Sequence, residues 1–566
     1  MAAAQGDPTT PRLEKFDSSR PESDIEKALS SDGSSEEDIA PYVEQRQAEE
    51  ARDVTTFRGK LAAFTIRLSQ YGVETRGVVP TAPEARTDTR FWNLLFLWIS
   101  ANFNILAFST GSLGPAIFAL GLKESLLVIF FINLLSATLP AYFSTFGPRL
   151  GMRQMIVSRY SFGFYGNMIP SLLNLITFMG FLILNLILGG ETLAAVSGYQ
   201  AGHGGGLSWD IGIAIVGVIA LLVTFCGYKV LYTYERFAWI PIVMVYIVAL
   251  GCGGKQLTYV ISPRTRLPHP QTHSLGQFYD TIRDLAPVVP ASSVTVLCFA
   301  ASIAGYMISW STLASDYTIY LDQSAPNSKV FLFAYSGFFF PNVICEMVGA
   351  AFAVSMHAPG NEAWLDGYKV NNVGGLLDEV MRPAGGFGKF CIVLLALSCI
   401  AASSRSMHVQ LLRKLPMHHA MLCSYPSIHL FDCRHRHARA HTYYTSLISF
   451  TGVIGYWAAA WASIVLAEHV LFRQSHTGAS ETAGYDSATW NDPSALPTGI
   501  PALAAFALSF ALIVPAMNQV WFQGPIGRRV GDIGFELAFI VAGGLYSVFR
   551  HVEKKVCVGR TGGLGS

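Results

Sequence analysis

The chain has 566 residues, of which 51% are hydrophobic and only 14% are charged, and its formal net charge is +1 with histidine neutral. The first 90 positions hold 29 of the 77 Asp, Glu, Lys and Arg residues, so the remaining 476 positions share 48. A stretch so poor in charge is typical of a membrane-embedded protein, and the balanced net charge argues against nucleic acid as a partner.

Residues 1–90 are expected to form a disordered cytoplasmic tail with a possible interfacial helix. As far as about residue 50 the sequence is rich in Ser, Glu, Asp and Pro and has too few apolar side chains to fold alone. Residues 1–20 lack an apolar core, so no signal peptide is predicted. Apolar positions recur every three or four residues over 57–72, which fits a helix on the inner leaflet or a nascent helix in solvent.

Eleven apolar runs follow, each long enough, or nearly so, to cross about 30 Å of hydrocarbon. They centre on residues 94–120, 125–146, 168–190, 211–226, 237–252, 292–313, 330–354, 387–404, 445–472, 500–521 and 532–549. Together they predict an all-α polytopic membrane domain over residues 91–550.

Basic residues in the short connections predict the orientation. Arg149, Arg153 and Arg159 follow the second run, whereas the connection after the third run has neither Lys nor Arg before Trp209. The positive-inside rule then places the N-terminus in the cytoplasm. The tail 551–566 is also basic, so the same rule favours a cytoplasmic C-terminus. Twelve spans would place both ends in the cytoplasm, whereas eleven would place the C-terminus outside.

The first and sixth runs are each interrupted by polar and small residues. The sequence FSTGSLGP at 108–115 places Ser109 and Gly111 inside the first run, and Gly305 and Trp310 lie within a similar interruption of the sixth. Broken helices at these two positions are expected from two inverted five-helix repeats, and their freed backbone groups can hold a cation or a polar solute. For the first run, a packing kink is the alternative.

The third run contains a candidate binding face. Phe181 and Asn185 lie four residues apart, on one side of a helix. A ring offers a stacking surface and a carboxamide offers donors and an acceptor, so the pair suits a flat heterocycle with amide and amine groups at its edge. Taken alone, Phe181 is more often a packing residue.

Two acids are candidates for coupling to an ion. Glu346 lies deep in the seventh run, where an acid is costly unless paired or protonated. It fits either a proton carrier or a structural acid bonded to a neighbouring helix. Asp316 follows the sixth run, and an interfacial anchor is its alternative role. The cysteine spacing suggests no zinc module, so neither a metal nor a cofactor is expected.

Residues 405–444 break the pattern of spans. The segment contains seven of the chain's fourteen histidines together with lysines and arginines, so no membrane helix is predicted there. A metal site is a functional alternative, although membrane topology would be lost to form it. Its ligands would be Cys423, Cys433, His435 and His437.

With these features, the chain resembles the nucleobase-cation symporter family, in its fungal purine-cytosine permease branch. The likeness runs from about residue 55 to 400 and resumes from about 450 to 555. The stretches that carry it are EARTDTRFWN (84–93), SANFNILAFSTGSLGP (100–115), FGPRLGMRQMIVSRYSFG (146–163), LNLILGGETL (184–193), SWSTLASDYTIYL (309–321) and DIGFELAF (532–539).

The resemblance implies a LeuT-type fold, with a five-plus-five inverted repeat and two extra C-terminal helices. It implies import of purine bases or cytosine across the plasma membrane, in symport with H⁺ or Na⁺ and usually with H⁺ in this branch. Phe181 and Asn185 should then line the base pocket, with Trp310 facing them and Ser109 and Gly111 marking the contribution of the first span. Relatives often have Trp at position 181 and Gln at position 191.

The eighth run departs from the family pattern. Relatives resemble LALSVIANNIPNIYS, whereas this chain reads LALSCIAASSRSMH and has Ala402 and Ser403 in place of adjacent asparagines that face the substrate. Since the ninth span is also absent, residues 405–444 resemble translation in a wrong frame or of a misjoined exon, and an inactive permease is one alternative. A solute receptor or membrane enzyme is another. The runs show no tight catalytic cluster, so no enzymatic activity is expected.

Overall fold

The computed structural model describes residues 79–198, 205–225, 236–261, 291–411, 439–473, 484–487 and 489–561. Regular secondary structure in these ranges is helical, apart from two isolated β-bridges, Asp88 with Leu321 and Asn518 with Gln523. The predicted tail helix at 57–72 and the candidate metal ligands between 423 and 437 lie outside the described residues.

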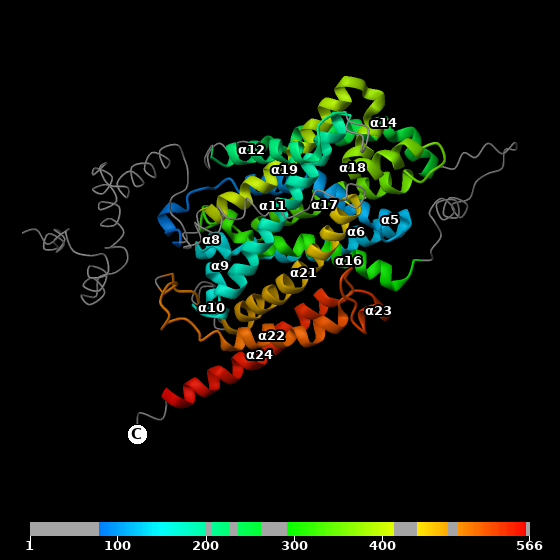
Figure 1. The fold of residues 1–566 in the computed structure, drawn as a ribbon. Helices are drawn as coiled ribbons and strands as arrows, with labels where there is room; N and C mark the ends of the chain where they lie inside the picture. The colour runs from blue at the N-terminus through cyan, green and yellow to red at the C-terminus, as the bar shows by residue number, and fades with distance from the viewer. Residues whose placement is uncertain are drawn as a thin grey trace, which may run out of the picture. The chain divides into compact units, whose positions relative to one another are not determined.

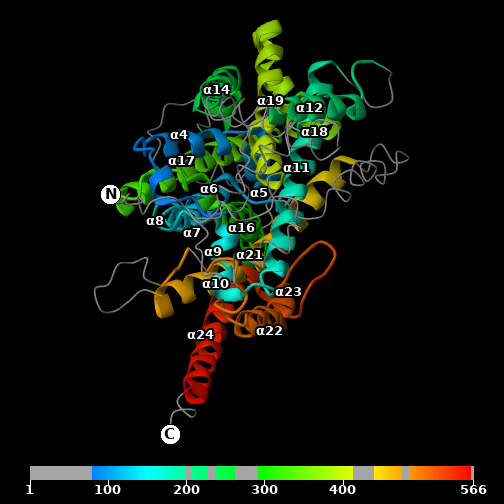
Figure 2. The same cartoon turned by 90° about the vertical axis from the view of Figure 1, so that its left-hand side faces the viewer.

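Each of the eleven apolar runs coincides with one or more helices, which confirms that prediction (Figures 1 and 2). Among the described residues, eight helical stretches are long and apolar enough to cross a membrane, a bent pair makes a ninth, and residues 209–223 and 500–516 form two shorter apolar helices. The helices that matter here are α4 (Asn93–Asn102), α5 (Ile105–Ala116), α6 (Leu122–Ser136), α7 (Thr138–Ser144), α8 (Phe146–Leu150), α9 (Gln154–Val157), α10 (Arg159–Phe162), α11 (Met168–Val196), α12 (Trp209–Phe225), α14 (Trp239–Ile261), α16 (Ser293–Ile308), α17 (Asn327–Ser355), α18 (Glu362–Met381), α19 (Gly385–Leu411), α21 (Arg439–Ala467), α22 (Ile500–Ala516) and α24 (Gly534–Thr561).

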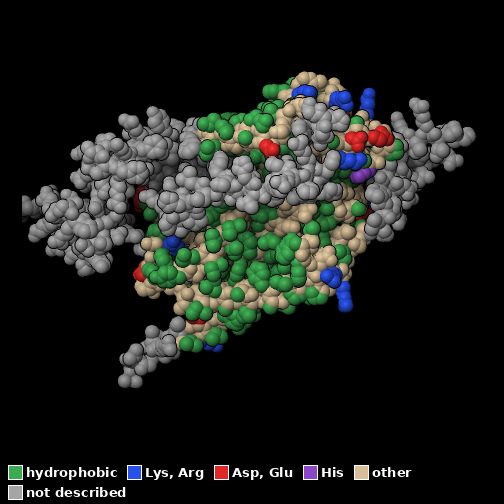
Figure 3. Space-filling model, in the orientation of Figure 1, with side chains coloured by type: hydrophobic (Ala, Val, Ile, Leu, Met, Phe, Trp, Pro, Cys, Tyr) green, Lys and Arg blue, Asp and Glu red, His purple; other side chains and the backbone are tan. Residues whose placement is uncertain are grey.

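The outer surface of this helical domain is apolar. Large hydrophobic side chains are exposed on many helices, among them Leu135, Leu222, Met244, Leu508 and Ile540. Figure 3 shows such side chains gathered across the lower half of one face, in the region of α21, α22 and α24, with charged side chains toward its margins. An extended apolar surface is what contact with lipid requires.

The first span is broken between α4 and α5, which meet at an angle of 53°. Asn104 joins the two pieces, because its Oδ1 accepts from the backbone N–H of Ala107 at 2.8 Å and its Nδ2 donates to the carbonyl of Ala101 at 2.7 Å. The side chain thus caps α5 and satisfies a carbonyl that the break leaves free.

The break is not at 108–115, so the sequence prediction of its position was wrong. That segment is helical within α5. The hydroxyls of Thr110 and Ser112 donate to carbonyls of the preceding turn, so they are satisfied inside the helix. Gly111 allows close packing, since a Cβ there would meet the backbone of Glu346 on α17.

The break in the sixth span is confirmed. Helix α16 ends at Ile308 and is followed by two 3₁₀ turns, η3 (Ser309–Thr312) and η4 (Ala314–Tyr317). Gly305, which the sequence placed within the interruption, is still helical and lies against the backbone of Thr451 on α21.

Candidate functional site

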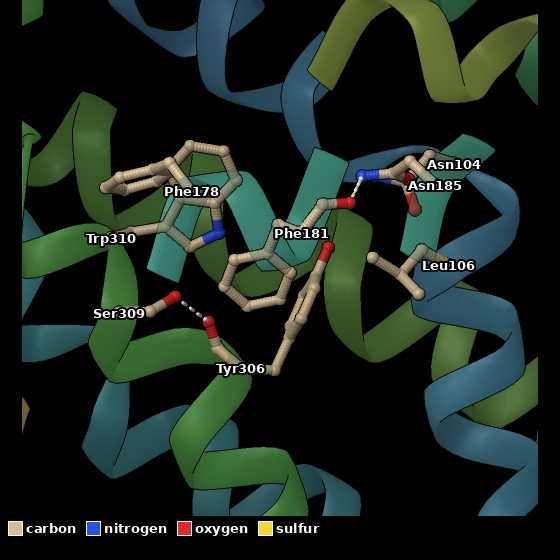
Figure 4. A pocket seen from close by; sticks show the side chains of 8 residues that line it. All are labelled: Asn104, Leu106, Phe178, Phe181, Asn185, Tyr306, Ser309 and Trp310. Atoms are coloured by element: carbon tan, nitrogen blue, oxygen red, sulfur yellow. Dashed lines mark hydrogen bonds between the residues drawn. The ribbon is translucent and has the colours of Figure 1, made fainter. Parts of the chain in front are cut away.

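A small cavity lies where the two broken spans meet α11. Its walls come from the α4–α5 junction, from α11 and from the end of α16 with η3, and Figure 4 shows the side chains converging from these elements. The lining residues are Asn104, Leu106, Phe178, Phe181, Asn185, Tyr306, Ser309 and Trp310. Three spans that are distant in sequence thus contribute to one site.

In this conformation the cavity is nearly closed. Its volume is about 20 Å³, which is room for about one water molecule. The ring of Phe181 stands between Trp310 and Tyr306, with its centroid 5.9 Å from that of Tyr306 (Figure 4). A planar solute would therefore have to displace the Phe181 ring or part the helices.

Asn185 presents an unpaired acceptor at the cavity. The residue is 2% exposed, its Nδ2 donates to the carbonyl of Phe181 at 2.9 Å, and its Oδ1 has no partner among the described residues. Asn102, Asn133 and Asn342 have an unpaired Oδ1 in the same way, and their Nδ2 atoms also bond to the carbonyl four residues earlier. An unpaired amide oxygen is thus no site by itself, but of these four only Asn185 lines the cavity.

Trp310 presents an unpaired donor. Within the described residues its buried indole N–H has no partner, while its ring contacts Trp98 edge-on at 5.6 Å between centroids. Ser309 beside it is satisfied by the carbonyl of Tyr306 at 2.7 Å. A donor and an acceptor left unpaired around one cavity are costly until a ligand or water pairs them. Together with the rings, they can bind a planar solute with a polar edge.

Ser109 and Gly111 do not line this cavity. Ser109 is buried near Tyr443 of α21, and Gly111 faces α17. The contribution of the first span comes from Asn104 and Leu106 instead.

Glu346 lies behind α5, outside the cavity lining. It is 0% exposed, and its Oε2 accepts from Nδ2 of Asn133 on α6 at 2.6 Å. Its Oε1 has no partner among the described residues. The acid thus joins α6 to α17, and no cation of the described part of the chain pairs with it.

Asp316, by contrast, is ion-paired. Its Oδ1 accepts from the backbone N–H of Gln154 at 2.7 Å, and its Oδ2 lies 3.9 Å from Nη1 of Arg153. The carboxylate therefore ties η4 to the beginning of α9, in the connection after the second span.

Sequence reasoning missed Asn104 and Tyr306. Two asparagines in the apolar run around residue 103 were an available signal, because a mid-span amide needs a partner. Tyr306 lies one helical turn before Trp310, so it shares that face.

Broken spans around a buried cavity in an all-helical membrane domain are typical of membrane transporters. A family model described as permease for cytosine/purines, uracil, thiamine, allantoin matches residues 81–532, and the chain belongs to this family. The family predicted from the sequence is confirmed, and the chain is a multi-pass membrane transporter rather than an enzyme.

Several relatives are fungal permeases. The chain is 31% identical over 500 residues to purine-cytosine permease fcyB of Emericella nidulans, covering 86% of this chain and 90% of that protein. It is 32% identical over 509 residues to purine-cytosine permease FCY2 of Saccharomyces cerevisiae, covering 88% and 89%.

The fold is that of a solved transporter. Mhp1, a nucleobase-cation-symport-1 family transporter in a closed conformation with bromovinylhydantoin bound, superposes with a TM-score of 0.55 at 14% identity, covering 85% of this chain and 96% of that one. This match confirms the predicted LeuT-type fold class.

Proposed function

We propose that the chain imports purine bases or cytosine by proton symport, through alternating exposure of the cavity to the two sides of the membrane. The main support is the cavity between the broken spans, where Asn185 offers an acceptor, Trp310 a donor and Phe181 an aromatic face. Cytosine, adenine and guanine carry both N–H donors and ring acceptors on a flat frame, so each complements this lining.

The base would stack between Phe181 and Trp310, with its edge toward Asn185. Because the cavity holds about one water molecule, the Phe181 ring has to swing aside as the base enters. The break at Asn104 and the change from α-helix to 3₁₀ turns after Ile308 are where the two spans can hinge, since regular α-helix ends at both.

Of the two acids, we favour Glu346 as the proton carrier. Among the described residues it has no cation beside it, and it contacts α6 and the backbone of α5, so its protonation can respond to movement of either helix. Asp316 is already paired with Arg153, which suits a fixed contact between η4 and α9 better than an exchanging ion site. Coupling to H⁺ rather than Na⁺ is part of the proposal.

We further propose that the protein lies in the plasma membrane with residues 1–90 and 551–566 in the cytoplasm and residues 91–550 embedded in lipid. Support comes from the arginines of the connection α8–α10 and from the basic C-terminal tail.

Uptake of labelled adenine, cytosine and hypoxanthine by fungal cells without their own base permeases tests the proposal. We expect saturable uptake that increases at acidic external pH and stops with a protonophore. Uptake that followed Na⁺ instead would refute the choice of coupling ion.

Because the chain has Ala402 and Ser403 where relatives have asparagines, the same assay should include a chain whose residues 395–450 are retranslated from the gene in the other two frames. If neither chain takes up any base, the proposed substrate class is wrong. If only the retranslated chain is active, the inactive-permease alternative holds for the chain as written.

A further inference from the structure

Glu191 is a buried acid that the proposed cycle does not use. It lies on α11 six residues after Asn185, which is about 9 Å further along the helix axis. The residue is 1% exposed, and its Oε2 accepts from Nδ2 of Asn372 on α18 at 2.7 Å. A carboxyl group thus joins α18 to the end of α11.

Asn372 lies where α18 bends. Its backbone has φ 52° and ψ −142°, and Asn371 before it is also non-helical. Asn371 accepts from Nε1 of Trp209 at 2.8 Å, and a Cβ at Gly374 would meet the backbone of α11. A positive φ in a residue other than glycine persists only where its surroundings hold it. Contacts with α11 and α12 therefore hold the bend of α18 in place, and the hydrogen bond from Asn372 to Glu191 is one of these contacts.

The groups around Glu191 are polar but uncharged. Tyr368 of α18 and Tyr443 and Tyr444 of α21 lie within electrostatic range of its carboxyl. The ring of Tyr368 stacks on that of Tyr444 at 5.6 Å between centroids, and the buried hydroxyls lie near other hydroxyls, that of Tyr368 near Tyr444 and that of Tyr443 near Ser109. Among the described residues of α5, α12, α18, α19 and α21, no Lys, Arg or His acts on the Glu191 carboxyl.

In these surroundings the protonated form of the Glu191 carboxyl is more stable than the ionised form. An ionised carboxylate removed from water without a cation is far more costly than a neutral, hydrogen-bonded acid. The carboxamide of Asn372 and the tyrosine hydroxyls each offer donors and acceptors, so they can pair with the protonated form. If α18 moves away from α11 and water reaches Glu191, the carboxyl ionises as an exposed Glu does, with a pKa of about 4.3 in model peptides. Closure of α18 at neutral pH therefore requires a proton.

We propose that Glu191 is a proton-binding site separate from Glu346, and that one proton binds there from the outer solution each time α18 closes onto α11. The proposal rests on the proposed function for its place in a transport cycle, although closure itself requires no particular base. The closed form binds the proton more tightly than the open form. Closure is thus favoured at low pH and is lost as the pH rises.

Hydrogen exchange of α18 in the full chain, purified into lipid nanodiscs, tests this from pH 5 to pH 8. Glu191→Gln keeps a group that can bond to Asn372 but cannot ionise, so it corrects for the intrinsic pH dependence of exchange. We expect protection of α18, relative to this variant at the same pH, to fall about tenfold for each pH unit. Glu362→Gln, at an exposed acid of the same helix, should behave as wild type. Identical pH dependence in wild type and Glu191→Gln would overturn the proposal.

A second variant covers the case in which Glu191→Gln does not fold. Asn372→Gly tolerates the positive φ but removes the carboxamide. Protection of α18 should then be lower than in wild type at every pH and should still fall as the pH rises. Wild-type protection in this variant would contradict the assigned contact.

The exchange experiment uses no substrate, so it separates the two proposals. If neither the chain nor its retranslated version takes up any base but α18 protection follows pH, the proposed function is wrong and the proton site stands. If adenine is taken up but α18 protection ignores Glu191, the proton site is wrong and the function stands.

Discussion

Replacing Asn185 with Ala removes the carboxamide of the cavity and should affect folding little. Within the described residues its Nδ2 bonds only to the Phe181 carbonyl of its own helix, and Ala favours helix. When the polar edge of a bound base is left unpaired away from water, the binding free energy becomes less favourable by about 1–3 kcal/mol. This corresponds to about 5- to 150-fold weaker binding. We expect the KM for adenine and cytosine to rise by this factor at a nearly unchanged surface level.

Asn342→Ala is the matched control. Asn342 is equally buried, its Nδ2 makes the same bond to the carbonyl four residues earlier at 2.8 Å, and its Oδ1 is also unpaired among the described residues. It does not line the cavity. The assay is initial uptake over a range of base concentrations, divided by the amount of tagged protein at the surface. Equal losses in both variants, or no loss in Asn185→Ala, would refute the assignment of the site.

Three further substitutions test other parts of the account. Gly111→Ala should lower the free energy of unfolding by about 1–3 kcal/mol, since the new Cβ would meet the backbone of Glu346. Gly251→Ala is the control, because a Cβ there meets open space and should not destabilise the protein. Equal effects of the two in thermal unfolding would contradict the packing argument. Glu346→Gln keeps an acceptor for Asn133 but cannot ionise. In proteoliposomes, exchange of base across the membrane should therefore persist, while accumulation driven by a pH gradient is lost. Undiminished accumulation would exclude Glu346 as the proton carrier. Trp310→Phe keeps a ring and removes the N–H, so base binding should weaken about 5-fold for a loss of about 1 kcal/mol, and unchanged affinity would show that the indole donor is not used.

The spans could be predicted from the sequence because hydropathy acts locally. Each apolar run coincides with helix, since a backbone in lipid has to satisfy its own hydrogen bonds. The position of the first break could not be predicted in this way. Glycine, serine and proline at 108–115 disfavour helix in water, but in this helix Thr110 and Ser112 bond back to the preceding turn and Gly111 packs on α17. The break falls instead where Asn104 can cap a new helix.

The candidate site was predictable in part, for a related reason. Phe181 and Asn185 share a helix face by their spacing, and the cavity lies on that face. Asn104 and Tyr306 join them only through packing between spans, which no local pattern contains. Gly111 was placed at the solute by the family resemblance; in the structure the group that packs against it is the backbone of α17.

The most direct test of the central claim is a structure of the full chain determined with saturating adenine. The account predicts planar density between Phe181 and Trp310, with the base edge about 2.7–3.2 Å from the Asn185 carboxamide and the Phe181 ring moved from its present position. A base bound elsewhere, with the Phe181 ring still filling the space between Trp310 and Tyr306, would contradict it.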